Sequence, residues 1–436
     1  MFAVLAGREI TVAFQAILRE FFQPQKKLVP YVERLVAGVP PTMSKNDPAV
    51  AGDTRDAVLA RVRVLIPLIR ESAAAAEDAR TLPRQTVDAL LAAGICRILI
   101  PPRYGGYGLS LDTWFDVVCE IAKADASHGW CASLMVHHPH YVGHFPEAAQ
   151  NAIWSDGVDS AIAASVQPAG QVEVVKGGYR ISGEFGFASG INHSRWLVVG
   201  SIAAGASGPE ARFFLIRPNE YRVKDTWFTT AMRGTGSNTA VCDDIFVPAE
   251  HTLALDDLRE GSTPGAKLHA NPIYRAPWVS YAPLTFTAPM LGAARGAYEL
   301  FRGWIKTRKA GRGGGLLADL ASVQVPASRA AADLDAAELL LRRAVDAARS
   351  PQKPSLELCA RTMRDCSRAA ELCVAAIDAL IGMSGTAGFA EANPIQRAWR
   401  DIHFAAMHVA LNSEQNFRHF GRGELGLPRD PHLPFY

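Results

Sequence analysis

The sequence predicts an α+β protein in three parts: an N-terminal α-helical domain, a middle antiparallel β-domain and a C-terminal four-helix bundle. Three observations predict this order. Apolar residues recur at helical spacing from residue 54, alternating runs broken by Gly, Asn and Pro follow from residue 158, and four long amphipathic segments come after residue 282. We therefore expect domains at 53–157, 158–250 and 282–436, with 251–281 as a connecting loop.

The first 52 residues are expected to be an extension or linker, because Gly38-Val39-Pro40-Pro41 breaks any regular element. Met43 is a candidate for the true initiator. The glycine-rich loop 103–108 lacks the lysine and the strand–helix setting of a phosphate loop, so we interpret it as a tight turn. Helices are expected at Ala57–Ala79, between Pro83 and Gly94, at Leu111–Ala124 and at Ser127–Tyr141.

Short alternating runs predict that the β-domain is a small antiparallel sandwich or barrel, which Pro248 closes. Gly177-Gly178 marks a tight hairpin turn, because glycine adopts a positive φ without steric cost. The expected strands are Ser160–Val166, Val172–Lys176, Tyr179–Phe187, Trp196–Ala203, Ala211–Arg217, Tyr221–Phe228 and Thr239–Val247.

The connection Asp256–Tyr281 contains three prolines and is expected to form a lid or a pocket wall. Breaks at 311–315 and 382–393 separate the helices of the bundle, and the proline-rich tail 421–436 is expected to be extended. The bundle helices are expected at Met290–Lys309, Leu317–Arg349, Pro354–Met383 and Pro394–Phe420.

Composition argues against several classes of protein. The chain has 45 basic and 43 acidic residues, so no net field favours nucleic acid or an anionic membrane. No apolar run reaches the ~18 residues that span a bilayer, and the apolar start before Arg8 is too short for a signal-peptide core. A cytoplasmic enzyme is the default expectation. Seven cysteines argue against a disulfide framework, and Cys359, Cys366 and Cys373 are interpreted as small core residues on one helix face.

Two stretches carry candidate site residues. The strand ending at Ala188-Ser189-Gly190 has small residues that leave room for a large flat ring against the backbone. On an earlier helix, His137 and His138 follow Trp130 by seven and eight residues, so they share its face approximately. The cluster His137-His138-Pro139-His140 has no acidic or cysteine partner at ligand spacing, and no metal site is expected.

The last expected helix places Arg397, Asp401, Phe404 and His408 on one face. A histidine whose pKa lies near neutrality can donate or accept a proton, which makes His408 a candidate catalytic residue. His403 lies on another side of this helix and is interpreted as structural.

Five motifs stand out between residues 53 and 430. They are His128-Gly129-Trp130; residues 177–190; residues 232–239 with Phe246-Val247-Pro248; Pro289–Gly292 with Arg295-Gly296; and Pro394–Asp401 with His408. Together they resemble the flavin-dependent monooxygenases built on the acyl-CoA dehydrogenase fold. This two-component group includes the p-hydroxyphenylacetate hydroxylase oxygenases and the tailoring hydroxylases of aromatic polyketides, and residues 292–296 and 364–366 are most similar to the latter.

The resemblance implies an enzyme that takes reduced FAD or FMN (FADH2 or FMNH2) from a separate NAD(P)H:flavin reductase. With O2 it would hydroxylate a phenolic or polycyclic natural-product molecule through a flavin C4a-hydroperoxide. The resemblance also implies a homotetramer, and the composition adds a cytoplasmic location with no nucleic-acid or membrane partner.

An acyl-CoA dehydrogenase-like flavin oxidoreductase is the main alternative. Many such dehydrogenases carry a catalytic glutamate in a Glu-Gly motif after the Arg-Asp pair of the last helix. Here residues 402–409 follow Arg400-Asp401 without that motif, and a dehydrogenase needs a carboxylate to take the α-proton. N- or S-oxygenation on the same scaffold and a non-catalytic ligand-binding relative are further alternatives.

The resemblance also implies roles for the candidate residues. Ser189 would lie beside flavin N5, Trp130 would form an aromatic wall against the ring, and His408 would be the catalytic histidine. His138 would contact the substrate hydroxyl and act in catalysis, with His137 as the other histidine that could face the pocket.

Further residues match positions with binding roles in this family. Ser165 and Arg233 match substrate contacts, although Arg233 could equally fix its own turn. Ser384-Gly385-Thr386 matches the turn that binds the flavin phosphate, and Arg308 matches an arginine that reaches the flavin of a neighbouring subunit. No aromatic residue occurs in 309–315 to stack on adenine, so the choice between FAD and FMN stays open.

Overall fold

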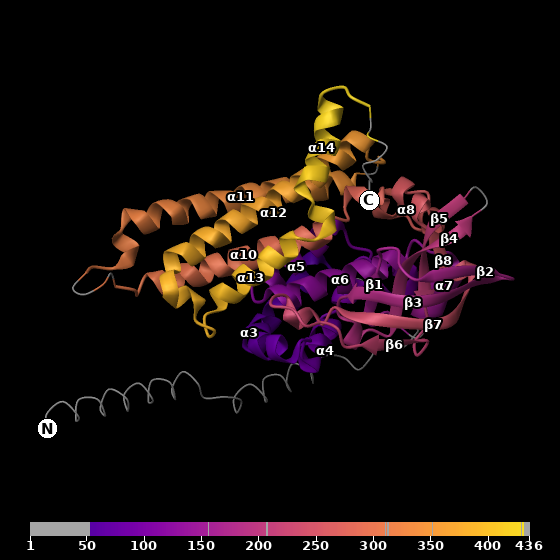
Figure 1. Ribbon diagram of the computed structural model, residues 1–436, viewed down its shortest axis with the longest axis horizontal. Coiled ribbons are helices and arrows are strands. Elements are labelled where there is room, and N and C mark those ends of the chain that lie inside the picture. The colour runs from indigo at the N-terminus through magenta and orange to yellow at the C-terminus, as the bar shows by residue number, and fades with distance from the viewer. Residues whose placement is uncertain are drawn as a thin grey trace. The chain divides into compact units, whose positions relative to one another are not determined.

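The computed structural model describes residues 53–155, 157–205, 208–309, 311, 314–350, 352–428 and 430. The expected extension at 1–52, with its alternative start at Met43, lies outside these residues. Figure 1 shows the predicted order of helices, strands and long helices along the described chain. The predicted α+β fold class is confirmed.

Helix α6 is the central element of the N-terminal helical part. All of its residues are buried, including Pro139, which does not end the helix. Because α6 is buried on every side, it packs against α5 and α10 and also against the first strand, β1. The sequence did not predict α7. The helices are α3 (Arg55–Ala79), α4 (Arg84–Ala92), α5 (Leu111–Ala122), α6 (Ala126–Val142) and α7 (Glu147–Trp154).

The predicted β-sandwich is confirmed, and Gly177, with a φ of 84°, forms the predicted hairpin turn. One sheet has the order β1 (Ile162–Ser165), β4 (Trp196–Gly205), β5 (Gly208–Ile216), β8 (Thr252–Ala254). The other has the order β2 (Gln171–Val175), β3 (Gly178–Ala188), β7 (Asn238–Pro248), β6 (Tyr221–Lys224). Two expectations were wrong: β1 and β4 run parallel, and β8 continues the domain beyond Pro248.

The connection at 256–281 is more regular than expected. It contains α8 (Leu255–Glu260) and α9 (Pro264–Leu268), followed by two short 3₁₀ turns. Tyr274 and Tyr281 are fully buried. These aromatic anchors pack the segment into the protein.

The C-terminal bundle contains α10 (Leu284–Ile305), α11 (Ala321–Arg349), α12 (Leu356–Ser384), α13 (Pro394–Ala406) and α14 (Ser413–Glu424). The expectation of one helix over 394–420 was wrong. The chain leaves α13 at Met407, passes through a 3₁₀ turn at Val409–Leu411 and starts α14 after Asn412. His408 therefore lies beyond the helix, with extended backbone angles. Residues 421–424 belong to α14, so the expected tail is not extended there.

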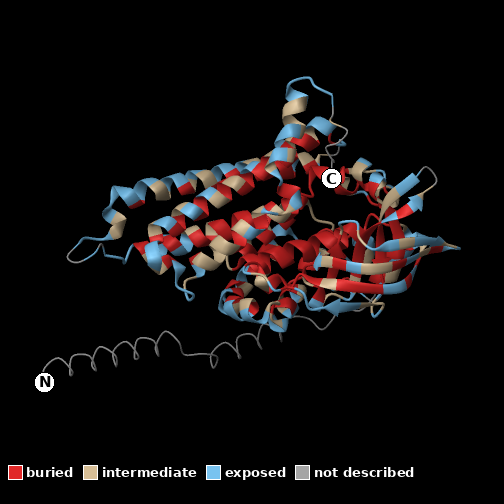
Figure 2. Ribbon diagram, viewed as in Figure 1, coloured by how far each residue is buried: buried red, intermediate tan, exposed pale blue. Residues whose placement is uncertain are grey.

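The two helical parts share one hydrophobic core, while the sandwich has its own. Trp114 of α5, Phe301 of α10 and Ile377 of α12 belong to the shared cluster. Figure 2 shows the buried residues on the inner sides of these helices and between the sheets. Cys359, Cys366 and Cys373 are buried, as predicted.

By length and composition alone, α12 with its following turn (Leu356–Phe389, mean hydropathy 1.6) could cross a membrane. This finding qualifies the expectation that no such segment exists. In the protein α12 packs against α10, α11, α13 and α14. We therefore interpret it as the core helix of the bundle.

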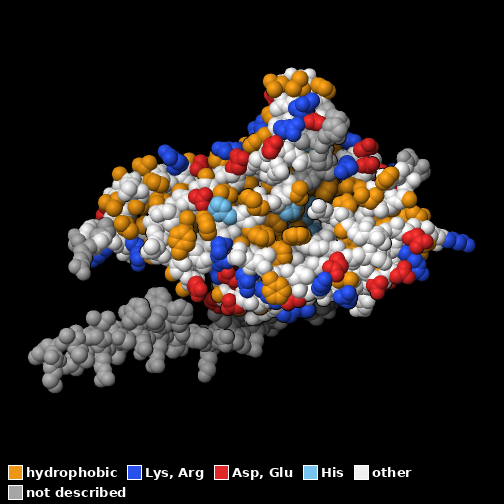
Figure 3. Space-filling model, viewed as in Figure 1, with side chains coloured by type: hydrophobic (Ala, Val, Ile, Leu, Met, Phe, Trp, Pro, Cys, Tyr) orange, Lys and Arg blue, Asp and Glu red, His pale blue; other side chains and the backbone are white. Residues whose placement is uncertain are grey.

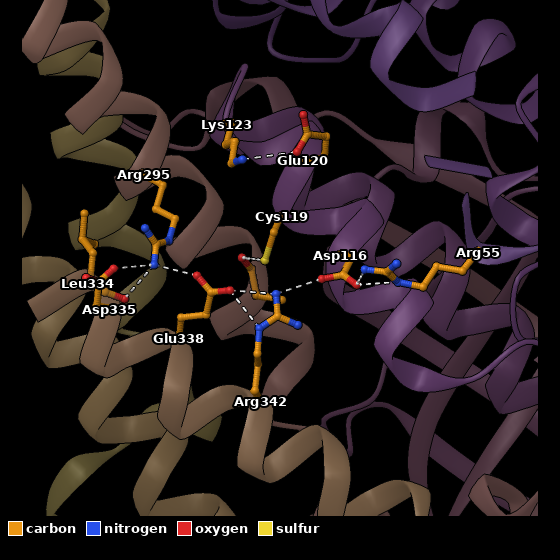
Figure 4. Close-up of polar contacts among 11 residues, drawn as sticks. Arg55, Asp116, Cys119, Glu120, Lys123, Arg295, Leu334, Asp335, Glu338 and Arg342 are labelled. Carbon is orange, nitrogen blue, oxygen red and sulfur yellow. Dashed lines mark hydrogen bonds and ion pairs between the residues drawn. The ribbon is translucent and has the colours of Figure 1, made fainter. Parts of the chain in front are cut away.

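A chain of ion pairs connects the two helical parts (Figure 4). Arg55 of α3 pairs with Asp116 of α5 at 2.6 Å, and Asp116 pairs with Arg342 of α11 at 3.1 Å. Glu338 then joins Arg342 to Arg295 of α10, at 2.7 and 2.6 Å. The network links α3, α5, α10 and α11.

Candidate active site

The candidate site begins at the end of β3, where the backbone turns sharply. Phe187 has a φ of 59°, a left-handed conformation that is costly for a bulky residue. Its side chain is 73% exposed, while the next two residues, Ala188 and Ser189, are buried. The Ser189 N–H donates to the carbonyl of Phe187 at 3.0 Å. The strained turn therefore sends Phe187 outward and Ser189 inward.

Ser189 lies against α6. The indole Nε1–H of Trp130 donates to the Ser189 hydroxyl at 3.3 Å, although the two residues are 59 positions apart. On its other side, the Ser189 hydroxyl contacts that of Ser237 at 2.7 Å. The serine is thus held between the first helical part and the turn before β7.

His408 completes an aromatic cluster with Trp130 and Phe286. Its imidazole stacks on Phe286 with a centroid separation of 3.6 Å and lies 5.9 Å from the Trp130 ring. Its Nδ1 accepts the Ala410 N–H at 3.1 Å, so the neutral ring carries its proton on Nε2. Burial lowers the pKa of His408 to about 4, which keeps this donor form at neutral pH.

The structure brings Ser189, Trp130 and His408 together, as the sequence predicts. Figure 3 shows a hollow in this face between the helices and the β region, with a histidine side chain inside it. Ser189 and Trp130 are each 9% exposed, and His408 is partly exposed. The cluster is therefore largely apolar and shielded, and it presents an indole face, a hydroxyl and an imidazole.

His138 points to the β-domain with the opposite tautomer. Its Nδ1–H donates to the Ile162 carbonyl at 2.7 Å, so the neutral ring leaves a lone pair on Nε2. Burial lowers the pKa of His138 to about 4. The Ser165 hydroxyl, at the end of the same strand, donates to the Gly186 carbonyl at 2.7 Å. Ser165 thus joins β1 to the strand that ends at Ser189.

His137 points to the other side of α6. Its Nδ1 contacts the Thr285 hydroxyl at 3.0 Å, and its ring lies against Tyr141 and His140 inside the helical core. It lies outside the cluster around Ser189, and which of His137 and His138 faces a substrate stays a prediction. Within the described residues, no group of three or more His, Cys, Asp or Glu is arranged to hold a metal ion.

Arg233 uses its guanidinium to fix its own turn. Nε donates to the Glu77 carbonyl at 3.1 Å and Nη1 donates to the Thr229 carbonyl at 2.9 Å. Of the two roles left open by the sequence, these contacts favour the fixing of the turn, and a substrate contact stays a prediction.

The residues expected to bind phosphate do not join the Ser189 cluster in this chain. Ser384 closes α12 by donating to the Leu380 carbonyl at 2.8 Å, and Gly385 and Thr386 are exposed. Residues 384–386 come before the start of α13, whereas His408 comes after the end of α13. The two ends of this helix are about 20 Å apart along its axis. Arg308 is exposed and lies over the Trp304 ring at 4.8 Å. Their assignment to flavin stays a prediction.

Sequence reasoning missed three residues of the cluster. Phe286 stacks on His408, and the hydroxyls of Thr235 and Ser237 contact each other at 2.6 Å behind Ser189. Thr235 and Ser237 lie in the motif at 232–239, which could have identified them, whereas nothing in the sequence around Phe286 indicates its stacking partner.

The described residues fit a flavin. A flat apolar ring needs an aromatic wall, which Trp130 and Phe286 provide, and a polar partner at its edge, which Ser189 provides. The buried side chain of Asp401, from the last of the family motifs, accepts the Met232 N–H at Oδ1 at 2.6 Å. Its contact is with that turn, so the structure assigns it no part in taking a substrate proton.

Comparison with known proteins agrees with this fit. Residues 56–157 match the model of the acyl-CoA dehydrogenase N-terminal domain, and residues 284–413 match that of the C-terminal domain. The oxygenase subunit HsaA of a flavin-dependent monooxygenase from Rhodococcus jostii is 34% identical over 376 residues, covering 84% of this chain and 98% of the relative.

Two further comparisons extend the match. The oxygenase component of an FADH2-dependent resorcinol hydroxylase from Rhizobium sp. is 32% identical, covering 85% of this chain and 94% of the relative. The crystal structure of 3-HSA hydroxylase from Rhodococcus sp. RHA1 superposes with a TM-score of 0.82 at 33% identity, covering 87% of this chain and 99% of that one. The chain therefore belongs to the family of flavin-dependent monooxygenase oxygenase components built on the acyl-CoA dehydrogenase fold.

Proposed function

We propose that this protein is the oxygenase component of a two-component system that uses reduced flavin and O2 to hydroxylate a phenolic aromatic molecule. The observation that carries the proposal is the cluster of Trp130, Ser189 and His408, in which a neutral imidazole lies beside an indole ring and a buried hydroxyl. His408 presents an Nε2–H donor, and His138 presents an Nε2 lone pair.

The bound flavin would supply the activation of O2, and the chain supplies the setting. Trp130 and Phe286 shield the ring from water, and Ser189 holds its edge. His138 can accept a hydrogen bond from a phenolic hydroxyl at Nε2, which increases the electron density of the aromatic ring. His408 can donate a hydrogen bond from Nε2 to oxygen that develops negative charge.

Other parts of the proposal concern the flavin and the assembly. We infer that a separate NAD(P)H:flavin reductase supplies FADH2 or FMNH2 and that the protein works in the cytoplasm. Arg308 and the Ser384–Thr386 turn lie away from the cluster within one chain, which supports a homotetramer in which neighbouring subunits share each flavin site. The polyketide-like motifs support a polycyclic natural product as substrate.

Single-turnover experiments test the proposal. The protein is mixed anaerobically with reduced FAD or reduced FMN, and then with oxygenated buffer that contains resorcinol or p-hydroxyphenylacetate. We expect hydroxylated product with reduced flavin and none with oxidised flavin. Immediate release of all reducing equivalents as H2O2 with every phenol, or bleaching of bound oxidised flavin by an acyl-CoA, would refute it and favour the dehydrogenase-like alternative.

A further inference from the structure

Three hydroxyl groups form a continuous chain behind Ser189, and its far end is a backbone carbonyl. Ser189 contacts Ser237 at 2.7 Å, Ser237 contacts Thr235 at 2.6 Å, and Thr235 contacts the Met232 carbonyl at 2.8 Å. All of these side chains are at least nine-tenths buried. Each of the three contacts is therefore a direct hydrogen bond between buried groups, without a bridging water molecule.

The order of protons along this chain has one solution. Two oxygens at these distances need a proton between them. The carbonyl of Met232 has none, so Thr235 donates to it. Ser237 must then donate to Thr235, and Ser189 must donate to Ser237. Each hydroxyl has a single proton, and all three are used.

Ser189 is therefore left as an acceptor. Of its two lone pairs, one accepts the Trp130 Nε1–H at 3.3 Å, and no donor among the described residues is recorded for the other. The end of the chain is also well anchored. The Met232 carbonyl accepts the Trp227 Nε1–H at 2.9 Å, and the Met232 N–H is held by Asp401 at 2.6 Å.

We propose that Thr235 and Ser237 are positioning residues that orient the Ser189 hydroxyl as an acceptor and thereby make the site select reduced over oxidised flavin. The inference rests on the proposed function, with Ser189 at flavin N5. Reduced flavin carries a hydrogen on N5 that can donate to Ser189. Oxidised flavin has only a lone pair there, which would face the lone pair of Ser189 without a proton between them.

Binding constants for the two redox forms of the flavin test the inference without turnover. Reduced flavin is titrated anaerobically and oxidised flavin aerobically into wild type and variants. The readout is the selectivity ratio, which is the Kd of oxidised flavin divided by the Kd of reduced flavin. We expect wild type to bind reduced flavin about tenfold more tightly than oxidised flavin, a difference of about 1.4 kcal/mol, because only the reduced form can donate to Ser189. In Ser237→Ala or Thr235→Val the Ser189 hydroxyl proton can turn away from position 237 and donate to N5 of oxidised flavin. Oxidised flavin should then bind more tightly, and the ratio should approach one.

The controls separate orientation from simple loss of structure. Thr235→Ser keeps the hydroxyl and should keep the ratio. Ser194→Ala removes a nearby hydroxyl that donates to the Gly190 carbonyl outside the chain, and it should also keep the ratio. Ser189→Ala should also lower the ratio, but by weakening the binding of reduced flavin rather than by strengthening that of oxidised flavin.

Two outcomes would overturn the inference. Folded Ser237→Ala and Thr235→Val proteins that bind flavin with the wild-type ratio would show that Ser189 does not depend on them, while the proposed function would stand. Wild-type protein that binds neither form of flavin would refute the proposed function and this inference with it.

Discussion

The imidazole of His408 lies on the ring of Phe286, with 3.6 Å between the centroids and 23° between the planes. Trp130 lies 5.2 Å from Phe286 and 5.9 Å from His408. Rings from α6 and α10 thus hold the imidazole, which belongs to the segment after α13, in one orientation. His408 owes its position to these contacts and to the Ala410 N–H, because the helix has already ended.

His408→Ala is expected to lower product formation by about 10²-fold or more, because the Nε2–H donor is lost. The measurement is hydroxylated product per reduced flavin in a single turnover, with H2O2 as the competing product. His403→Ala is the matched control. His403 lies on another side of α13, where its Nε2 contacts Asp378 of α12, so its loss should change the yield by less than about twofold. Equal yields from the two variants would contradict the assignment.

The pH dependence of hydroxylation should show no ionisation of His408 or His138 near neutrality. Burial lowers the pKa of each to about 4, so both remain neutral as the pH falls from 9 to 5 and gain a proton only below that range. The yield with a fixed substrate, measured across pH 5 to 9, checks this. An inflection between pH 6 and 7 that disappears in His138→Gln would contradict it.

Phe187 allows a test of backbone strain at the edge of the site. Phe187→Gly should keep the free energy of unfolding within about 0.5 kcal/mol of wild type, because relief of the positive φ offsets the lost packing and glycine entropy. Phe187→Val should lose about 1–2 kcal/mol, since a β-branched residue tolerates this conformation poorly. Thermal unfolding of both variants measures the difference, and equal stabilities would argue against strain.

Much of the fold and part of the site could be predicted from the sequence, for physical reasons that particular residues show. Alternation around Tyr179 and Ile181 and the turn at Gly177 report local backbone preferences, so strand β3 was predicted almost to its ends. The break after α13 was missed because apolar residues keep helical spacing through the 3₁₀ turn. The contact between Ser189 and Ser237 depends on pairing of β3 with β7, which no local pattern encodes.

Asp401 should make stability fall as pH rises. Burial, with a contribution from Asp125, raises the pKa of Asp401 to about 7, so between pH 4 and 7 the unfolded chain loses this proton while the folded protein keeps it. Asp401→Asn should gain stability relative to wild type across this range, by at most about 1.4 kcal/mol for each pH unit. Asp401→Ala leaves the Met232 N–H unpaired and should lose about 1–3 kcal/mol at every pH. Denaturant unfolding at pH 4 and pH 8 distinguishes these outcomes, and a pH-independent difference for Asp401→Asn would contradict the raised pKa.

His140 should limit stability in acid. Within the described part of the chain both of its ring nitrogens are buried without a hydrogen-bond partner, and burial, helped by nearby His269, lowers its pKa to about 3. Below pH 6.5 this histidine binds a proton in the unfolded chain but not in the folded protein. Each further unit of pH therefore lowers the free energy of unfolding by about 1.4 kcal/mol until the folded pKa is reached. His140→Phe fills a similar volume and removes both unpaired nitrogens, so it should match or exceed wild type at pH 7 and exceed it further at pH 5. The difference in free energy of unfolding between the two pH values is the measurement. A His140→Phe protein with the same acid dependence as wild type would show that this histidine is not buried in its neutral form.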